Sequence, residues 1–444
     1  MTACVEDRTT VDGFVHPDFF SVATAFREQL GKYPGGAAVC VYHRGACVVD
    51  LWGGCRDAAG TPWTRDTMSP SFSTTKGIAA TLLHIMVDRG LLDYGDRVAK
   101  YWPEFAHAGK QAITVRHVLA HQSGLYHIRQ MIDRADRMLD WEFMIRAIER
   151  TPPAHKPGTR TGYHGLTFGF LVGEILQRVT GKTFSALVQD ELVGPLQLDG
   201  MYIGTPPEAL HRAAKLIWPR RRFLTSHLRF DPEAGFAGDV VKTITSAVER
   251  ALHIGGVGLD LHSMLNALAP RGIGAFDFGT DAALRATIPA ANGLFTARSL
   301  AKVYAALAGG GEIDGVRLLS RRTLARATQI QNPTHARVVI PFDMRWRLGY
   351  HFVATTRGIL QHGFGHFGFG GSGAWADPSR RLAVALIVNS GMGTPFGDFR
   401  IPRLSSVVLD CVNRRPAPAS HVPAKTASKS RRGWWRVLDA LPVG

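Results

Sequence analysis

The segment Met68-Ser-Pro-Ser-Phe-Ser73-Thr-Thr-Lys76-Gly-Ile-Ala-Ala80 places a hydroxyl and an amine three residues apart at the start of a predicted helix. Residues three apart on a helix share a face, so the Lys76 amine can reach the Ser73 hydroxyl. The unpaired N–H groups and the positive dipole at a helix start favour a developing oxyanion and disfavour a protonated lysine. A Ser-x-x-Lys match also arises by chance in a chain of this length, so the flanking residues must decide.

The residues after Lys76 predict a helix that is apolar on nearly every side. Gly90 is expected to end it, and its apolar positions are Ile78, Ala79, Leu82, Leu83, Ile85, Met86 and Val87. A helix without a polar face belongs inside a core. Because burial lowers the pKa of a lysine toward the neutral amine, this flank favours a catalytic Ser73–Lys76 pair over a solvated lysine.

The composition limits the class of protein. With 45% hydrophobic residues, the 444-residue chain can bury a large core. The N-terminus, Met-Thr-Ala-Cys-Val-Glu-Asp-Arg, has early acids and no apolar stretch, so no signal peptide is expected. The longest nearly apolar run, Gly77–Val87, is too short to cross a bilayer. Without a Cys-x-x-Cys spacing, the cysteines are expected to be reduced in a cytoplasmic protein; they are Cys4, Cys40, Cys47, Cys55 and Cys411.

Most of the net charge of +16 lies in two stretches. Six basic residues and no acid lie between His211 and Phe230, and a further net charge of +6 lies between Cys411 and the C-terminus. Aromatic residues accompany both stretches, so peripheral contact with an anionic membrane is one interpretation and a solvated surface is another. No recognition motif accompanies the basic residues, so nucleic acid is not expected as a partner.

Predicted strands lie at both ends of the chain, with helices between them. Ala37–Tyr42 and Ala46–Trp52 predict a β-hairpin, and strand patterns return in Arg347–Val353, Gly373–Ala376 and Leu382–Val388. This order implies one sheet built from both chain ends, with a helical subdomain inserted between them. The expected helices are Phe19–Leu30, Gly77–Arg89, Val115–His121, Trp141–Glu149, Leu166–Val179, Phe184–Leu192, Val240–Leu252, Ser299–Leu307 and Ser320–Thr328.

Two histidines follow in Thr114-Val-Arg-His117-Val-Leu-Ala-His121-Gln-Ser-Gly124, which is typical of a capped helix that ends at a glycine. Their spacing of four residues would allow both to bind one metal ion. There is no His-Glu-x-x-His motif and no third ligand nearby, so structural histidines are favoured. We expect neither a metal nor another cofactor.

The loop Pro157-Gly-Thr-Arg-Thr-Gly-Tyr163-His-Gly165 precedes the predicted helix Leu166–Val179. A tyrosine in a loop is usually a packed amphipathic ring. The alternative is a phenol beside Lys76, whose cation would favour the phenolate and make Tyr163 a second base.

A glycine-dense stretch, Phe364-Gly-His366-Phe-Gly368-Phe369-Gly-Gly-Ser372-Gly-Ala-Trp-Ala-Asp-Pro378, matches Gly-x-Gly-x-x-Gly twice. A dinucleotide site needs a helix directly after the glycines, whereas Asp377-Pro378-Ser-Arg predicts a hairpin into the next strand. Glycines in an inner strand instead let a substrate carbonyl approach backbone N–H groups, as an oxyanion hole requires.

Together these segments resemble the serine β-lactamase / D,D-peptidase superfamily, and most closely the class-C-β-lactamase-related carboxylesterases (family VIII esterases). The resemblance runs from about Phe14 to Val412. It rests on Leu51-Trp-Gly-Gly54, Ser73-Thr-Thr-Lys76, the Ile113–Leu125 segment, Tyr163-His-Gly165 and Gly365-His366-Phe-Gly368-Phe-Gly-Gly371.

The resemblance implies an α+β fold with an antiparallel sheet flanked by helices, an all-helical subdomain, and an active site where the two meet. The implied catalytic domain is 1–413, with its sheet from about 14–65 and 293–412 and its helical subdomain from about 66–292. Residues 414–444 are expected to form a basic linker and a short amphipathic tail. Oligomeric state is left open.

The resemblance also implies the roles of individual residues. Ser73 would be the nucleophile, Lys76 and Tyr163 would transfer protons, and His366 would stand in the third motif. The oxyanion hole would combine the Ser73 amide with one from the Gly368–Phe369 strand, and Gly165 would border the substrate.

Two positions depart from the pattern of β-lactamases. The tyrosine motif there ends in Asn, whose amide holds the side-chain amide of the drug, whereas this chain has Gly165. The third motif there is Lys-Thr-Gly, whereas His366-Phe367-Gly368 lacks a cation aimed at a substrate carboxylate. Both departures favour neutral esters with an apolar acyl group. No Gly-x-Ser-x-Gly motif is present, which disfavours an α/β-hydrolase.

The leading hypothesis is a metal-free serine carboxylesterase that cleaves small ester substrates of short to medium acyl chain through an acyl-enzyme. A β-lactamase or a D-amino-acid peptidase of the same superfamily is the alternative within the enzyme class. A catalytically inactive, membrane-associated relative is the alternative outside it, and the retention of Ser73, Lys76 and Tyr163 argues against that alternative.

Overall fold

The computed structural model describes residues 9–217, 261–331, 336–340, 342–391 and 398–414. The predicted helix Val240–Leu252, the Arg220–Arg222 cluster and the C-terminal tail lie outside the described residues. None of the described helices is both long enough and apolar enough to cross a membrane.

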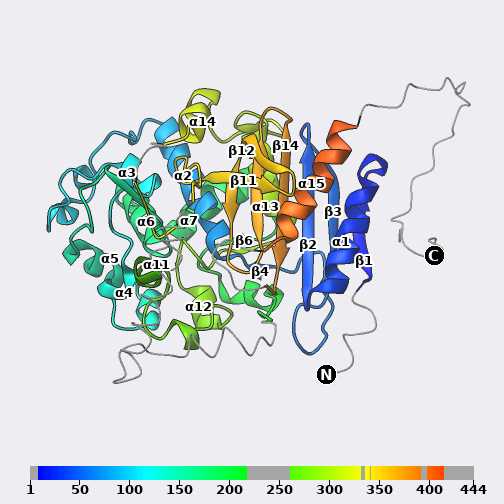
Figure 1. The fold of residues 1–444 in the computed structure, drawn as a ribbon, viewed down its shortest axis with the longest axis horizontal. Coiled ribbons are helices and arrows are strands. Elements are labelled where there is room, and N and C mark those ends of the chain that lie inside the picture. Colours follow the sequence, from blue (N-terminus) through cyan, green and yellow to red (C-terminus); the bar gives the residue numbers. More distant parts are fainter. Residues whose placement is uncertain (1–8, 218–260, 332–335, 341, 392–397, 415–444) are drawn as a thin grey trace, which may run out of the picture.

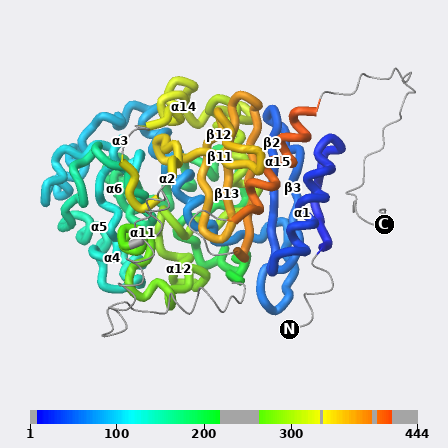
Figure 2. Tube along the Cα trace, in the orientation of Figure 1, coloured from blue at the N-terminus to red at the C-terminus, as the bar shows by residue number. Residues whose placement is uncertain are grey.

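A seven-stranded antiparallel sheet is built from both ends of the chain. The strand order is β1-β3-β2-β14-β13-β12-β11, and the two chain ends meet where β2 pairs with β14. Figure 2 shows the N-terminal strands in blue next to the C-terminal part in orange. The prediction of one such sheet is confirmed. The strands are β1 (Val11–Val15), β2 (Gly36–His43), β3 (Ala46–Gly54), β11 (His351–Thr355), β12 (Gly358–Phe367), β13 (Gly373–Asp377) and β14 (Leu382–Val388).

Strand β14 shows that both faces of the sheet are covered. Its even-numbered residues pack with α1 (Phe20–Lys32) and α15 (Arg400–Asn413), and its odd-numbered residues pack with α13 (Ala297–Ala308). Figure 1 shows this arrangement, with α1 and α15 side by side on one face. Because neither face meets water, β14 is a continuous apolar run, and each fully buried leucine or valine stabilises the fold by about 1.5–3 kcal/mol.

The segment between the two halves of the sheet is mainly helical. At its centre, α2 (Thr75–Asp88) is buried at every position from Thr75 to Val87, as its nearly all-apolar sequence predicts. Gly90 adopts a left-handed φ of +74° just after the helix ends. In the described residues, the other α-helices with more than one turn are α3 (Val115–Leu119), α4 (Ile128–Met131), α5 (Trp141–Arg150), α6 (Thr167–Thr180), α7 (Phe184–Val188), α11 (Leu261–Leu268), α12 (Asp281–Arg285) and α14 (Arg321–Thr328).

Short strands also occur outside the main sheet. A three-stranded sheet in the order β4-β7-β6 lies next to the start of α2, and β5 pairs in parallel with β10. Three of these strands fall within 66–292, so that segment is not purely helical. The short strands are β4 (Ser69–Pro70), β5 (Arg160–Gly162), β6 (Met201–Tyr202), β7 (Leu294–Phe295), β8 (Glu312–Ile313), β9 (Val316–Arg317) and β10 (Ala336–Val338); the one-turn α8 is Gly194–Leu196.

Two elements near the C-terminal end differ from the sequence-based expectation. Strand β11 begins at His351 rather than at Arg347, because the Arg347 amide donates to Tyr350 O at 2.8 Å and closes a turn. Helix α15 was not predicted. Its first turn contains Pro402, which a helix tolerates there because the first N–H groups have no intrahelical partner, and its buried residues recur with helical spacing.

The cysteines only partly match the prediction of reduced thiols. Cys40, Cys47 and Cys411 are free. Cys55 is disulfide-bonded. The prediction is therefore wrong for Cys55, because the absence of a Cys-x-x-Cys spacing does not exclude a disulfide.

Candidate active site

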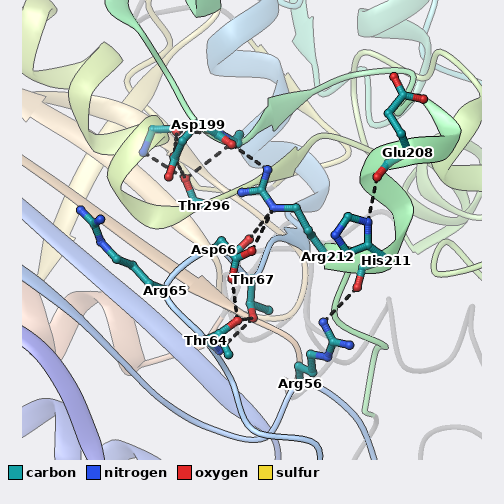
Figure 3. A network of polar contacts seen from close by, with 12 residues as sticks. Arg56, Thr64, Arg65, Asp66, Thr67, Asp199, Glu208, His211, Arg212 and Thr296 are labelled. Atoms are coloured by element: carbon teal, nitrogen blue, oxygen red, sulfur yellow. Dashed lines mark hydrogen bonds and ion pairs between the residues drawn. The ribbon is translucent and has the colours of Figure 1, made fainter.

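A polar network holds the segment that leads into Ser73 (Figure 3). The Arg212 side chain donates to Asp66 O at 3.0 Å and to Asp199 O at 2.7 Å, and Thr296 donates its hydroxyl to the Asp199 carboxylate at 3.2 Å. The Met68 amide in turn donates to Arg212 O at 3.0 Å. The chain ahead of β4 is thus fixed to the 199–212 segment and to the start of α13, and this fixes the approach to the nucleophile.

Ser73 lies in a tight 3₁₀ turn, Phe72–Thr74, directly before α2 begins at Thr75. The Thr75 hydroxyl donates to Phe72 O at 2.6 Å and holds the turn against the helix. Helix α2 therefore starts two residues later than Ser73, but the turn keeps Ser73 and Lys76 on the same side. Ser73 is partly exposed, whereas Lys76 is fully buried.

The Lys76 amine is hydrogen-bonded to the nucleophile. Its Nζ donates to Ser73 Oγ at 2.8 Å and to Ala290 O at 2.9 Å. Burial lowers the pKa of Lys76 well below its ordinary value of 10.5. The site therefore favours a neutral amine, which has a lone pair available to accept a proton.

Tyr163, the first residue of the Tyr163-His-Gly165 motif, also contacts the Ser73 hydroxyl. Its phenol donates to Ser73 Oγ at 2.9 Å, and Lys76 Nζ lies 5.1 Å from the centre of its ring. Burial raises the pKa of Tyr163 well above its ordinary value, and the hydrogen bond to Ser73 opposes this only in part. Before substrate binds, Tyr163 is therefore a neutral phenol. This differs from the phenolate considered in the sequence analysis, because a neutral Lys76 supplies no cation to favour it.

An aromatic wall holds the Tyr163 ring. Trp346 stacks on it with ring centroids 5.4 Å apart and an angle of 13°, and His121 packs against both rings. His117 points elsewhere, since its ring nitrogen caps α3 by accepting from the Thr114 amide at 3.3 Å. The two histidines therefore do not form a metal pair. Within the described ranges, no group of three or more His, Cys, Asp or Glu residues could hold a metal ion.

His366 lies at the end of β12, behind Tyr163. Its ring stacks at 6.4 Å from that of Tyr163 and meets His351 edge-on at 4.7 Å. Burial lowers the pKa of His366 well below 6.5. The third motif therefore presents a neutral imidazole where β-lactamases have a lysine.

His351 fixes the backbone of the third motif. Its Nε2 accepts from the Phe367 amide at 3.1 Å, and its Nδ1 lies 2.7 Å from Phe352 O. These contacts assign the neutral tautomer with the proton on Nδ1, which burial favours by lowering the pKa of His351 to about 4. A side chain on β11 thus holds the end of β12 in place.

The glycine-rich turn after β12 contacts the nucleophile turn. A Cβ on Gly368 would lie 2.2 Å from Ser71 O, so only glycine permits this approach. The Thr74 hydroxyl donates to Ser372 O at 3.2 Å across the same contact. The Gly368 amide donates to Ser372 O at 2.7 Å. That N–H is therefore engaged within the turn, which leaves the Phe369 amide as the candidate oxyanion donor of the Gly368–Phe369 pair.

Gly165 contacts helix α11. A Cβ at Gly165 would lie 2.4 Å from Leu268 Cδ2 and 2.9 Å from Ala267 O. The space in which an asparagine side chain would begin is thus filled by α11. Gly165 allows this helix to pack close to the tyrosine motif.

The structure brings Ser73, Lys76, Tyr163 and His366 together and adds residues that the sequence did not reveal. Trp346 lies in a stretch without regular periodicity, so no pattern marked it. His351 lies in an expected strand and could have been found only from the pairing of that strand with the third motif. The Ala290 carbonyl that accepts from Lys76 carries no sequence signal, because any residue has one.

Several known proteins are similar to this chain in fold and in sequence. The model of the Beta-lactamase family matches residues 22–408. The chain is 39% identical over 387 residues to "Esterase/beta-lactamase LipL" of Mycobacterium tuberculosis, covering 85% of this chain and 83% of that protein. Two solved structures, each covering 90% of this chain and 99% of the matched chain, are a family VIII carboxylesterase (TM-score 0.75, 34% identity) and a penicillin-binding protein homologue from Caulobacter crescentus (TM-score 0.73, 31% identity). The chain therefore belongs to the Beta-lactamase family, as an esterase/β-lactamase-type hydrolase whose structural neighbours include carboxylesterases.

Proposed function

We propose that this protein is a carboxylesterase that cleaves neutral esters of short to medium acyl chain through an acyl-enzyme on Ser73. One observation carries the proposal: Ser73 Oγ lies 2.8 Å from the buried Lys76 amine and 2.9 Å from the Tyr163 phenol. A nucleophile held between a neutral base and a proton donor suits covalent acyl transfer.

Acylation follows from the charges of these three groups. Ser73 Oγ attacks the ester carbonyl while its proton moves to the Lys76 lone pair. The new ammonium is close to the Tyr163 ring and lowers the cost of losing the phenol proton. Tyr163 then gives its proton to the leaving alkoxide and regains one from Lys76, so the alcohol departs neutral and the amine is restored.

Deacylation reverses the same proton path. Water takes the place of the alcohol, and its proton passes through Tyr163 to Lys76 as its oxygen attacks the acyl carbonyl. The Ser73–carbonyl bond then breaks, and the proton returns to Ser73 Oγ. The acid leaves and the site returns to its starting protonation state.

The backbone amides of Ser73 and Phe369 are the proposed donors to the oxyanion. Ser73 lies at the N-terminal turn of α2, whose dipole favours negative charge. Phe369 directly follows Gly368, the residue in close contact with the nucleophile turn. Preorganised amides of this kind are worth about 2.7–4 kcal/mol each in transition-state stabilisation.

The features around the site favour esters over β-lactams or D-amino-acid peptides. Leu268 and Ala267 fill the space beside Gly165, where an amide that binds a drug side chain would begin. The neutral His366 provides no cation for a substrate carboxylate. The carboxylesterase structure of 34% identity supports the same preference, while the name of the LipL relative keeps weak β-lactamase activity as the second candidate.

We expect the purified protein to hydrolyse p-nitrophenyl butyrate with a kcat/KM far above those for nitrocefin and for a D-Ala-D-Ala peptide. The missing amide and the missing cation both weaken binding of the two anionic substrates. Measuring kcat/KM for the three substrates in one buffer tests this. A preference for nitrocefin would contradict the esterase proposal.

The pH dependence should report Lys76 as the base. Because only the neutral amine accepts a proton, kcat/KM should fall as the pH is lowered through the depressed pKa of Lys76. Tyr163 has a raised pKa, so no alkaline loss should appear up to about pH 9. A pH series with p-nitrophenyl butyrate checks both limbs, and an alkaline decline near neutral pH would mean that the phenol ionises early.

A further inference from the structure

A row of four phenylalanine rings leads away from the nucleophile. Phe72, which directly precedes Ser73, meets Phe369 edge-on with ring centroids 5.6 Å apart, and it meets Phe278 edge-on at 5.4 Å. Phe278 continues the row to Phe276 at 4.8 Å. The rings come from the nucleophile turn, the turn after β12 and the loop before α12, so three distant segments converge beside Ser73.

The outer rings of this row are half-buried. Phe72 is buried, whereas Phe369, Phe278 and Phe276 each keep part of their surface exposed. Single exposed apolar side chains are ordinary, but a contiguous set that begins at the nucleophile is the kind of surface that binds an apolar ligand. Phe72 also has a left-handed φ of +46°, a conformation rarely adopted by a bulky residue and one that tends to persist at functional sites.

The proton path determines which part of the ester lies along this row. The leaving alcohol must lie beside Tyr163, because Tyr163 supplies its proton in the proposed reaction. In the described part of the chain, His121, Trp346 and His366 pack on Tyr163, and none of the three belongs to the phenylalanine row. The row is therefore placed to receive the acyl part of the substrate.

We propose that Phe72, Phe369, Phe278 and Phe276 form the binding surface for the acyl chain, which makes saturated medium-chain acyl esters the preferred substrates. This inference rests on the proposed esterase function and specifies its substrate class. Each methylene that leaves water for an apolar surface is worth about a fourfold gain in kcat/KM. The value of kcat/KM should therefore rise with acyl length until the chain extends past Phe276.

The test uses p-nitrophenyl acetate, butyrate, octanoate and dodecanoate with the full-length protein and two variants, Phe278→Ala and Phe276→Ala. Both variants should hydrolyse acetate within about twofold of the wild type and lose at least about tenfold in kcat/KM on octanoate, since several methylenes lose their contacts. Phe14→Ala is the matched control, because Phe14 is an exposed ring on the edge strand β1. It should leave the whole series unchanged.

A second series, of acetate esters with increasingly long alcohols, separates the two sides of the substrate. The phenylalanine variants should not change the dependence on alcohol length, and a change confined to that series would overturn the acyl assignment. Equal losses on acetate and octanoate would also overturn it, and thermal melting of each variant identifies losses caused by unfolding. Wild-type protein that hydrolyses no ester would instead refute the proposed function itself.

Discussion

Ser73→Ala should abolish ester hydrolysis and leave the fold intact. Loss of the nucleophile lowers kcat of serine hydrolases by about 10⁶-fold, so activity should fall at least ~10⁴-fold. Ser73 is partly exposed and its hydroxyl is hydrogen-bonded to Lys76 and Tyr163, and loss of this one oxygen atom leaves no large cavity. Initial rates with p-nitrophenyl butyrate, together with thermal melting, measure the two effects separately.

Ser372→Ala serves as the control for this substitution. Ser372 lies in the neighbouring glycine-rich turn, where its hydroxyl accepts from the Val388 amide at 3.1 Å. Its loss should lower the melting temperature without abolishing turnover. If Ser73→Ala is fully active and Ser372→Ala is folded but inactive, Ser73 is not the nucleophile and Ser372 takes that role.

The second large effect concerns the proton-transfer pair. Lys76→Ala and Tyr163→Phe should each lower kcat by at least about 10²-fold, because each removes a group that moves a proton in the transition state. The double variant should lose much less than the product of the two single losses, since Lys76 and Tyr163 act on the same proton. Steady-state kinetics of the wild type, the two single variants and the double variant provide this double-mutant cycle.

Tyr350→Phe is the matched control for Tyr163→Phe. Tyr350 is also a fully buried tyrosine, and its hydroxyl bonds to Thr81 at 2.8 Å in the core beside α2. Its loss should affect stability but not the proton path. Near-wild-type turnover in Tyr163→Phe would remove the tyrosine from the mechanism and leave the lysine as the sole transfer group.

Sequence patterns were sufficient to predict the elements with strong periodicity. The nearly all-apolar segment after Lys76 predicted a buried helix, and the hairpin of β2 and β3 follows from strand patterns on either side of a short polar turn. Helix α15 was missed because Pro402 and the neighbouring pair Val407 and Val408 lower its predicted helical propensity. Only its packing on the sheet reveals its apolar face. The formation of α15 thus depends on its tertiary contacts more than on its local helical propensity.

The chemistry of the site was predictable in its residue types but not in its charges. The order of the motifs in the sequence predicted that Ser73, Lys76 and Tyr163 belong to one catalytic site. Whether Tyr163 is a phenol or a phenolate depends on the burial of both Tyr163 and Lys76, which no spacing in the sequence encodes. The engagement of the Gly368 amide likewise depends on the turn geometry after β12.

The pairing of β2 with β14 has a consequence for synthesis of the chain. The Gly36 amide donates to the side chain of Asn389, a residue 353 positions later, so the sheet closes only after synthesis has passed Asn389. Contacts this distant in sequence are slow to form. A nascent chain therefore carries Ser73 and Lys76 on the ribosome long before β12 is available to complete the candidate active site. The proposed esterase activity should therefore emerge only after β12 and β14 have been made, and the partly made chain should depend on chaperones while its apolar strands remain unpaired.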